Sequence, residues 1–159
     1  MILLKIILLI TFFFILFQDI KERKVYWFLF PIVAIVSGVL FYNDTLPELF
    51  VVNVIINLFV VILLLVVVYG YAKFKLKTSP KSVFGLGDAL LFLALTLSFS
   101  SVSFIVVFVF SLIFSLALHL FIKTKNKSLT VPLAGYMSLF FMLVYISHWT
   151  GISTNLYHI

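Results

Sequence analysis

The chain has 159 residues, of which 65% are hydrophobic and 10% charged, and its formal net charge is +6. So apolar a composition exceeds what a soluble domain of this length can bury, and it indicates one integral membrane domain over residues 1–159. The sequence contains no cysteine, which excludes disulfides and thiolate metal sites, and we expect neither a metal nor a cofactor.

Six apolar segments predict an all-α, polytopic protein with six transmembrane helices. In chain order the expected helices span 2–17, 26–42, 49–71, 85–99, 102–122 and 131–149. The first is expected to be retained, because no small-residue cleavage site follows it. Pro31 and Pro132 fall near helix starts, where a missing N–H costs least. A serine-rich break after residue 97 separates the fourth and fifth helices, since one helix over 86–122 would be about 55 Å long.

The basic residues are segregated along the chain. Ten of the eleven Lys and Arg residues fall in the loops 21–24, 73–81 and 123–127. With six helices these loops lie on one side, and the positive-inside rule makes that side cytoplasmic, with both termini on the outer, periplasmic side. The positive charge is therefore a signal of topology within a lipid bilayer, and we expect no nucleic-acid partner.

Two aspartates are the candidate catalytic residues. Asp19 ends the first apolar segment and Asp88 begins the fourth, so the expected topology places both at the cytoplasmic side. Carboxylates within a membrane domain are functional candidates by default. Two adjacent carboxyl groups can share one proton, so that one activates water while the other polarises a carbonyl. Asp88, at a helix N-terminus, is expected to start as the base and Asp19 as the acid.

Glycines flank the second aspartate. Gly85 and Gly87 permit close backbone approach by a substrate strand or by the first helix. The alternative interpretation is that they only pack helices while Asp88 caps a helix N-terminus. Two other functions stay open: a non-enzymatic membrane assembly subunit whose aspartates only cap helices, and a carrier that uses Asp19 and Asp88 as an ion relay.

The remaining polar residues of the helices are expected to be mostly structural. Asn53 and Asn57 share one helix face and predict hydrogen bonds between helices. His119 lies level with the aspartates and is more typical of a structural partner than of a catalytic residue. Tyr136 and Lys81 are candidates for lining the site.

Three motifs carry a family resemblance. They are QDIKERKV at 18–25, FGLGD at 84–88 and VPLAGY at 131–136. Together they resemble the type IV prepilin peptidases, the aspartic GxGD proteases of bacterial inner membranes. The chain departs from the family pattern at Tyr26 and Trp27, where members often have Pro-Asn, and at Leu90, where they often have Lys.

The resemblance implies a multi-pass enzyme of the inner (plasma) membrane that cleaves the leader of type IV pilin-like precursors at the cytoplasmic membrane face. Asp19 and Asp88 would be catalytic, and Gly85, Gly87 and Pro132 would shape the substrate site. Larger members carry a tetracysteine zinc region and methylate the new N-terminus. A chain without cysteine looks like the short, peptidase-only form.

Overall fold

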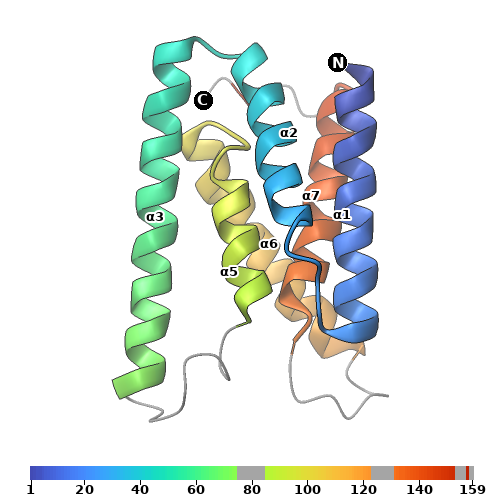
Figure 1. The fold of residues 1–159 in the computed structure, drawn as a ribbon, viewed down its shortest axis with the longest axis vertical. Coiled ribbons are helices and arrows are strands. Elements are labelled where there is room, and N and C mark those ends of the chain that lie inside the picture. The colour runs from blue at the N-terminus through green and yellow to red at the C-terminus, as the bar shows by residue number, and fades with distance from the viewer. Residues whose placement is uncertain (75–84, 123–130, 153–156, 158–159) are drawn as a thin grey trace.

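The computed structural model describes residues 1–74, 85–122, 131–152 and 157, and this part of the chain is all-helical, with no strand. The expected all-α fold is therefore confirmed. The helices are α1 (Ile2–Glu22), α2 (Leu29–Asn43), α3 (Pro47–Phe74), α5 (Leu86–Leu95), α6 (Ser101–Ile122) and α7 (Leu133–Trp149). They run roughly side by side in one bundle (Figure 1). By length and composition α1, α3 and α6 are apolar enough to cross a membrane.

Helix α1 extends beyond its expected end at residue 17. It continues to Glu22, so Asp19 lies in the last turn of the helix. Arg23 then adopts the left-handed conformation, with φ 55°, and its N–H donates to the carbonyl of Asp19. This C-cap closes the helix, and it holds Asp19 in helical geometry.

Helix α5 is shorter than expected, because it ends at Leu95 and not near residue 99. The N–H and the hydroxyl of Thr96 both donate to the carbonyl of Leu93, at 3.2 and 2.7 Å. This tightened turn satisfies a terminal carbonyl and stops the helix. With 10 residues, α5 is about 15 Å long, so the α5–α6 turn lies deeper in the bundle than the α2–α3 loop (Figure 1).

Helix α7 lies in the middle of the bundle and packs against α1 and α6. Helix α2 packs against both α1 and α5. Four fully buried aromatic side chains fill the space around it. They are Phe12 of α1, Phe99 of the α5–α6 turn, and Phe141 and Tyr145 of α7. Because each buried aromatic ring removes about 150–250 Å² from solvent, this cluster is a large part of the core.

Helix α3 packs at the edge of the bundle against α5 and α6, and most of its surface is exposed. Asn57 donates to the carbonyls of Thr96 and Phe99, both at 3.0 Å. The Asn53 Oδ1 atom accepts from the N–H and the hydroxyl of Ser101, both at 2.8 Å. The interhelical role expected for the two asparagines is thus confirmed, and they attach α3 to the buried α5–α6 turn.

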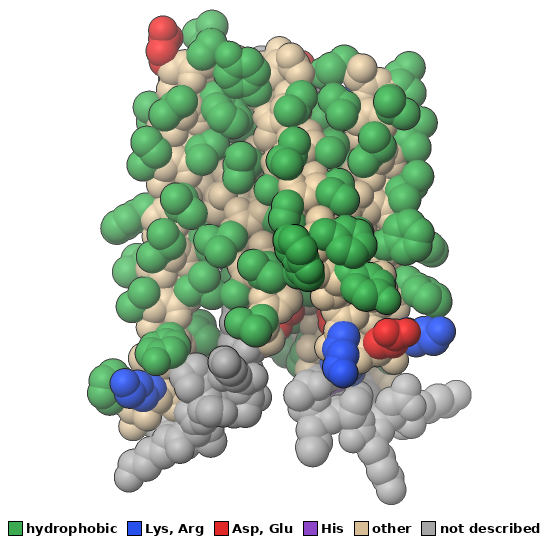
Figure 2. All heavy atoms as spheres, viewed as in Figure 1, with side chains coloured by type: hydrophobic (Ala, Val, Ile, Leu, Met, Phe, Trp, Pro, Cys, Tyr) green, Lys and Arg blue, Asp and Glu red, His purple; other side chains and the backbone are tan. Residues whose placement is uncertain are grey.

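The two ends of the bundle differ in charge. Apolar side chains cover the face of the bundle between its two ends, and the Lys and Arg side chains visible in this view lie at the lower end (Figure 2). Helix α1 ends, and α5 and α7 begin, at this lower end, which we call the aspartate end (Figure 1). We call the opposite end the far end. At the far end Lys5 lies 5.1 Å from the ring centroid of Trp149. Lys81, and the loops 75–84 and 123–130, lie outside the described residues.

Candidate active site

The first turn of α7 holds both aspartates. Backbone N–H groups in a helix's first turn lack acceptors within their own helix. Pro132, the N-cap, has no N–H, and the N–H of Leu133 donates to the carbonyl of Val131 at 2.9 Å. Ala134 N–H donates to Asp88 Oδ1 at 2.9 Å, and Gly135 N–H donates to Asp19 Oδ2 at 2.7 Å. Two consecutive amides therefore hold the carboxylates of α1 and α5.

This arrangement brings the two carboxylates close together. Because the amides belong to neighbouring residues, the two hydrogen-bonded oxygens are less than about 9 Å apart. The carboxylate of Asp19 also acts electrostatically on that of Asp88. The sequence predicted that Asp19 and Asp88 lie at the same depth, and the two side chains are indeed close together. Asp19 is 116 positions from its partner on α7, and Asp88 is 46 positions from its own.

The site is buried on the α1 side and more open on the α5 side. Asp19 is only 9% exposed, and Pro132, Ala134 and Gly135 are buried around it. Asp88 is half-buried, next to the exposed start of α5. Asp88 is therefore the more accessible of the two carboxylates.

Asp88 is not the N-cap residue of α5, so the capping interpretation holds only in part. The N-cap of α5 is Gly85, and Asp88 lies three residues further on. From that position a carboxylate can reach back to the N-cap N–H, and the Gly85 amide does interact with Asp88. Its other partner is Ala134 of α7, so the Asp88 carboxylate links two helices.

The glycines serve different contacts from those expected. A Cβ at Gly85 would lie 2.9 Å from Oδ2 of Asp88, and one at Gly87 would lie 3.6 Å from Phe30 Cζ. Neither glycine faces α1 within 4 Å. The close approach of α1 occurs at Gly135, where a Cβ would lie 3.1 Å from Asp19 Cβ. Of the two approaches expected at Gly85 and Gly87, that of the first helix is therefore not found, and that of a substrate strand stays a prediction.

Arg23 is a charged neighbour that the sequence analysis did not assign. It acts electrostatically on both Asp19 and Asp88. Its left-handed backbone reverses the chain immediately after α1, so a basic residue four positions after Asp19 stays near the site. A basic residue four positions after Asp19, at the end of a helix, was the sequence signal that could have identified Arg23 as a neighbour of the site.

Ala134 and Gly135 were also missed as site residues. The signal was a proline followed by small residues at a helix start, because free amides at a helix N-terminus bind carboxylates. Tyr136, the next residue, is buried as part of the same turn. His119 is buried in the last turn of α6 and is not among the groups acting on either carboxylate, which favours its structural interpretation.

The fold and the site together define a class: an all-α protein with helices of membrane-spanning length and a carboxylate pair held by one helix N-terminus. In the described ranges no three His, Asp or Glu side chains cluster as metal ligands would. Comparisons of the chain with known family models, curated proteins and solved structures found no match. A functional assignment therefore depends on the geometry and the sequence motifs.

Proposed function

We propose that this protein is a membrane-embedded aspartic endopeptidase that removes the leader of type IV pilin-like precursors at the cytoplasmic face of the inner membrane. One observation carries the proposal: the carboxylates of Asp19 and Asp88 accept hydrogen bonds from consecutive amides of α7. Such pairing of two acids is what metal-free hydrolysis through a shared proton requires. The resemblance of residues 18–25, 84–88 and 131–136 to prepilin peptidase motifs supplies the substrate class.

The helix ends suggest a role for each acid. Asp88 lies in the first turn of α5 and Asp19 in the last turn of α1. The backbone dipole favours an anion at a helix N-terminus and disfavours one at a C-terminus, so we assign Asp88 as the anionic base and Asp19 as the acid. Asp88 removes a proton from water as its oxygen attacks the scissile carbonyl carbon. Asp19 gives its own proton to the carbonyl oxygen, which yields a tetrahedral diol. As the C–N bond breaks, the proton on Asp88 goes to the leaving amine and one hydroxyl of the diol returns a proton to Asp19.

The proposed topology has six membrane spans, both termini outside and the basic loops in the cytoplasm. Its support is that Lys21 and Lys73 lie in the last turns of α1 and α3, which both end at the aspartate end (Figure 1), as the positive-inside rule requires for a cytoplasmic surface. A site at one end of the bundle fits cleavage at a membrane face, just before the apolar helix of the precursor. Because the enzyme's loops are basic, recognition of a basic leader depends on the residue at the cut and on helix packing.

The deciding experiment reconstitutes the protein in lipid vesicles with a pilin-like precursor. Asn at position 19 or 88 keeps the size of Asp and still accepts from the α7 amide, whereas Ala leaves that amide without a partner. We expect cleavage by the wild type alone, with Asp19→Asn and Asp88→Asn folded but inactive. An assembly subunit would cleave in no form, and a carrier would show aspartate-dependent ion flux without cleavage; either result would refute the proposal.

A further inference from the structure

Helix α2 is shorter than α1, although the two helices pack side by side. Helix α1 has 21 residues and α2 has 15, which is a difference of about 9 Å in length. The two helices are aligned at the far end, where Asn43 Nδ2, at the end of α2, donates to the sulfur of Met1 at 3.9 Å. Residues 23–28, which we call the α1–α2 connector, therefore run back along the bundle from the aspartate end before α2 begins (Figure 1).

The connector covers this length as an extended chain. Arg23 closes α1 at one end of the connector. At the other end, the N–H of Leu29 donates to the carbonyl of Tyr26 in the turn that leads into α2. Residues 24–26 are left to span about 9 Å, and three residues of a β-strand span about 10 Å.

The side chains of residues 24–26 alternate as they do in a strand. Lys24 and Tyr26 are exposed, whereas Val25 packs against the core. The N–H of Tyr26 donates to Gln18 Oε1 of α1 at 3.0 Å. Because successive residues of a strand direct their N–H and C=O groups to opposite edges, the N–H and C=O of Val25 point away from α1.

This outer edge of the connector has no hydrogen-bond partner among the described residues. Neither Lys24 nor Val25 forms a backbone hydrogen bond with another described residue. Helix α1 is long enough to cross a membrane, so a segment that runs back from its end enters the hydrocarbon layer. Irregular backbone at that depth must be covered by protein or by water in a cavity.

The connector passes beside the two carboxylates. At its start, Arg23 acts electrostatically on both Asp19 and Asp88. Just after its end, Phe30 of α2 faces the start of α5, since a Cβ at Gly87 would lie 3.6 Å from Phe30 Cζ. The chain between these two contacts therefore runs alongside the aspartate pair.

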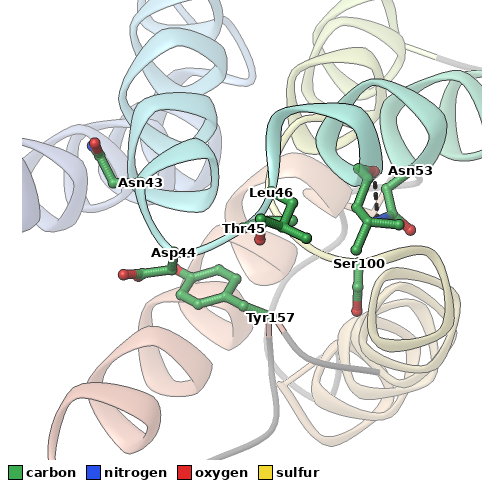
Figure 3. A pocket seen from close by; sticks show the side chains of 8 residues that line it. Asn43, Asp44, Thr45, Leu46, Asn53, Ser100 and Tyr157 are labelled. Carbon is green, nitrogen blue, oxygen red and sulfur yellow. Dashed lines mark hydrogen bonds between the residues drawn. The ribbon is translucent and has the colours of Figure 1, made fainter.

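The cavity at the far end of the bundle is a separate feature (Figure 3). Its volume is about 600 Å³, and it is lined by the α2–α3 loop together with residues that include Asn53, Ser100 and Tyr157. The length of α2, about 22 Å, separates this cavity from the connector. A peptide bond held there would be out of reach of the carboxylates, so a substrate of the pair must bind at the aspartate end.

We propose that residues 24–26 bind the precursor as an added strand, in which the N–H and C=O of Val25 pair with the substrate backbone next to the scissile bond. A helix must unwind before one of its peptide bonds can enter an active site, and unwinding leaves backbone groups that need partners. The outer edge of the connector supplies these partners by the main-chain pairing that lets a peptide extend an exposed strand. This inference rests on the proposed peptidase function and adds how the substrate is held.

The test measures the affinity of a fluorescent pilin-like precursor for the full chain in lipid nanodiscs, in an Asp88→Asn background so that no cleavage intervenes. Val25→Pro removes the N–H of the outer edge. Val25→Ala is the matched control, because it shortens the same side chain and keeps the N–H. The loss of one backbone hydrogen bond should weaken binding of the proline variant about 3- to 10-fold relative to the alanine variant. Since Val25→Pro breaks no hydrogen bond within the protein, its unfolding temperature should not fall below that of Val25→Ala.

Isotope-edited infrared spectroscopy provides a structural readout of the same complex. An isotope-labelled carbonyl in the precursor residue before the cut should move from a helix band to a strand band on binding to the Asp88→Asn enzyme. Adding Val25→Pro should reduce that change.

Three results would overturn the added strand: no binding of the precursor, equal affinity of the proline and alanine variants, or a helix band that persists in the complex. Equal affinity would mean that water covers the connector. Cleavage assays with Asp88 restored separate this outcome from the peptidase assignment. Cleavage with the same KM in Val25→Pro and Val25→Ala would refute the strand alone, whereas absence of cleavage in the wild type would refute the peptidase.

Discussion

Gly135 is the position where α7 and α1 come closest at the aspartates, and Gly135→Ala should impair cleavage strongly. The added Cβ would lie 3.1 Å from Asp19 Cβ, 3.2 Å from Asp19 Oδ2 and 3.3 Å from the carbonyl oxygen of Leu16. Carbon atoms in contact prefer about 3.5–4.0 Å, so α1 must move away by about 0.4 Å or more. The carbonyl of Leu16 is backbone, so a side-chain rotation cannot relieve the contact.

The expected loss of rate follows from that displacement. A misplacement of about 1 Å costs about 100-fold in rate, so a shift of half that size should lower kcat about 10-fold or more. Because the proposed recognition rests on packing of the substrate's apolar helix, KM should change little. The same overpacking should also reduce the free energy of unfolding by about 1–3 kcal/mol.

The assay compares initial rates of precursor cleavage and thermal unfolding for Gly135→Ala with two matched glycine variants. At Gly38 a Cβ would lie 3.2 Å from Leu97 Cδ2 and 3.3 Å from Leu97 Cβ, so Gly38→Ala produces similar overpacking away from the aspartates. At Gly70 nothing lies within 4 Å of the added atom. If Gly135→Ala cleaved as fast as the wild type, or if Gly38→Ala lost as much kcat, positioning of Asp19 by Gly135 would be refuted.

Three further predictions concern the site and its support. Asp19→Asn and Asp88→Asn should each lower kcat at least about 10²-fold with unchanged unfolding temperature, and residual cleavage near wild type in either would exclude a paired mechanism. Gly85→Ala should lower kcat more than Gly87→Ala, because only the first places a Cβ 2.9 Å from a carboxylate oxygen; equal rates would argue against this contact. Asn57→Ala should cost about 1–3 kcal/mol of stability, seen as a lower unfolding temperature, and no change would show that the buried carbonyls find other partners.

The aspartate pair also has a structural role, because it satisfies amides of α7 that would otherwise be buried without acceptors. The Ala and Asn variants separate this role from catalysis. Asp88→Ala removes the acceptor of Ala134 N–H, which should lower stability as well as activity. An Asn side chain keeps the acceptor, so its effect on cleavage reports chemistry alone.

Composition and charge distribution alone predicted the helical class of this protein. Apolar segments in water-free surroundings must form helices or closed barrels to pair their backbone groups, and the six expected segments agree with the described helices within a few residues at most ends. The sequence also placed Asp19 and Asp88 at the same end of the bundle. Successive membrane helices alternate in direction, so the first helix ends where the fourth begins. These inferences need only local patterns and the count of segments.

Contacts between distant segments required the tertiary structure. The carboxylates are held by hydrogen bonds that join residues far apart in the sequence, with separations of 46 and 116 positions. No local pattern encodes how α7 is rotated relative to α1 and α5. The sequence therefore missed Ala134 and Gly135. One of the two approaches considered for Gly85 and Gly87, that of α1, occurs at Gly135 instead. The early end of α5 has the same origin, because Asn57 of α3 supplies donors to the carbonyls left free at Thr96 and Phe99.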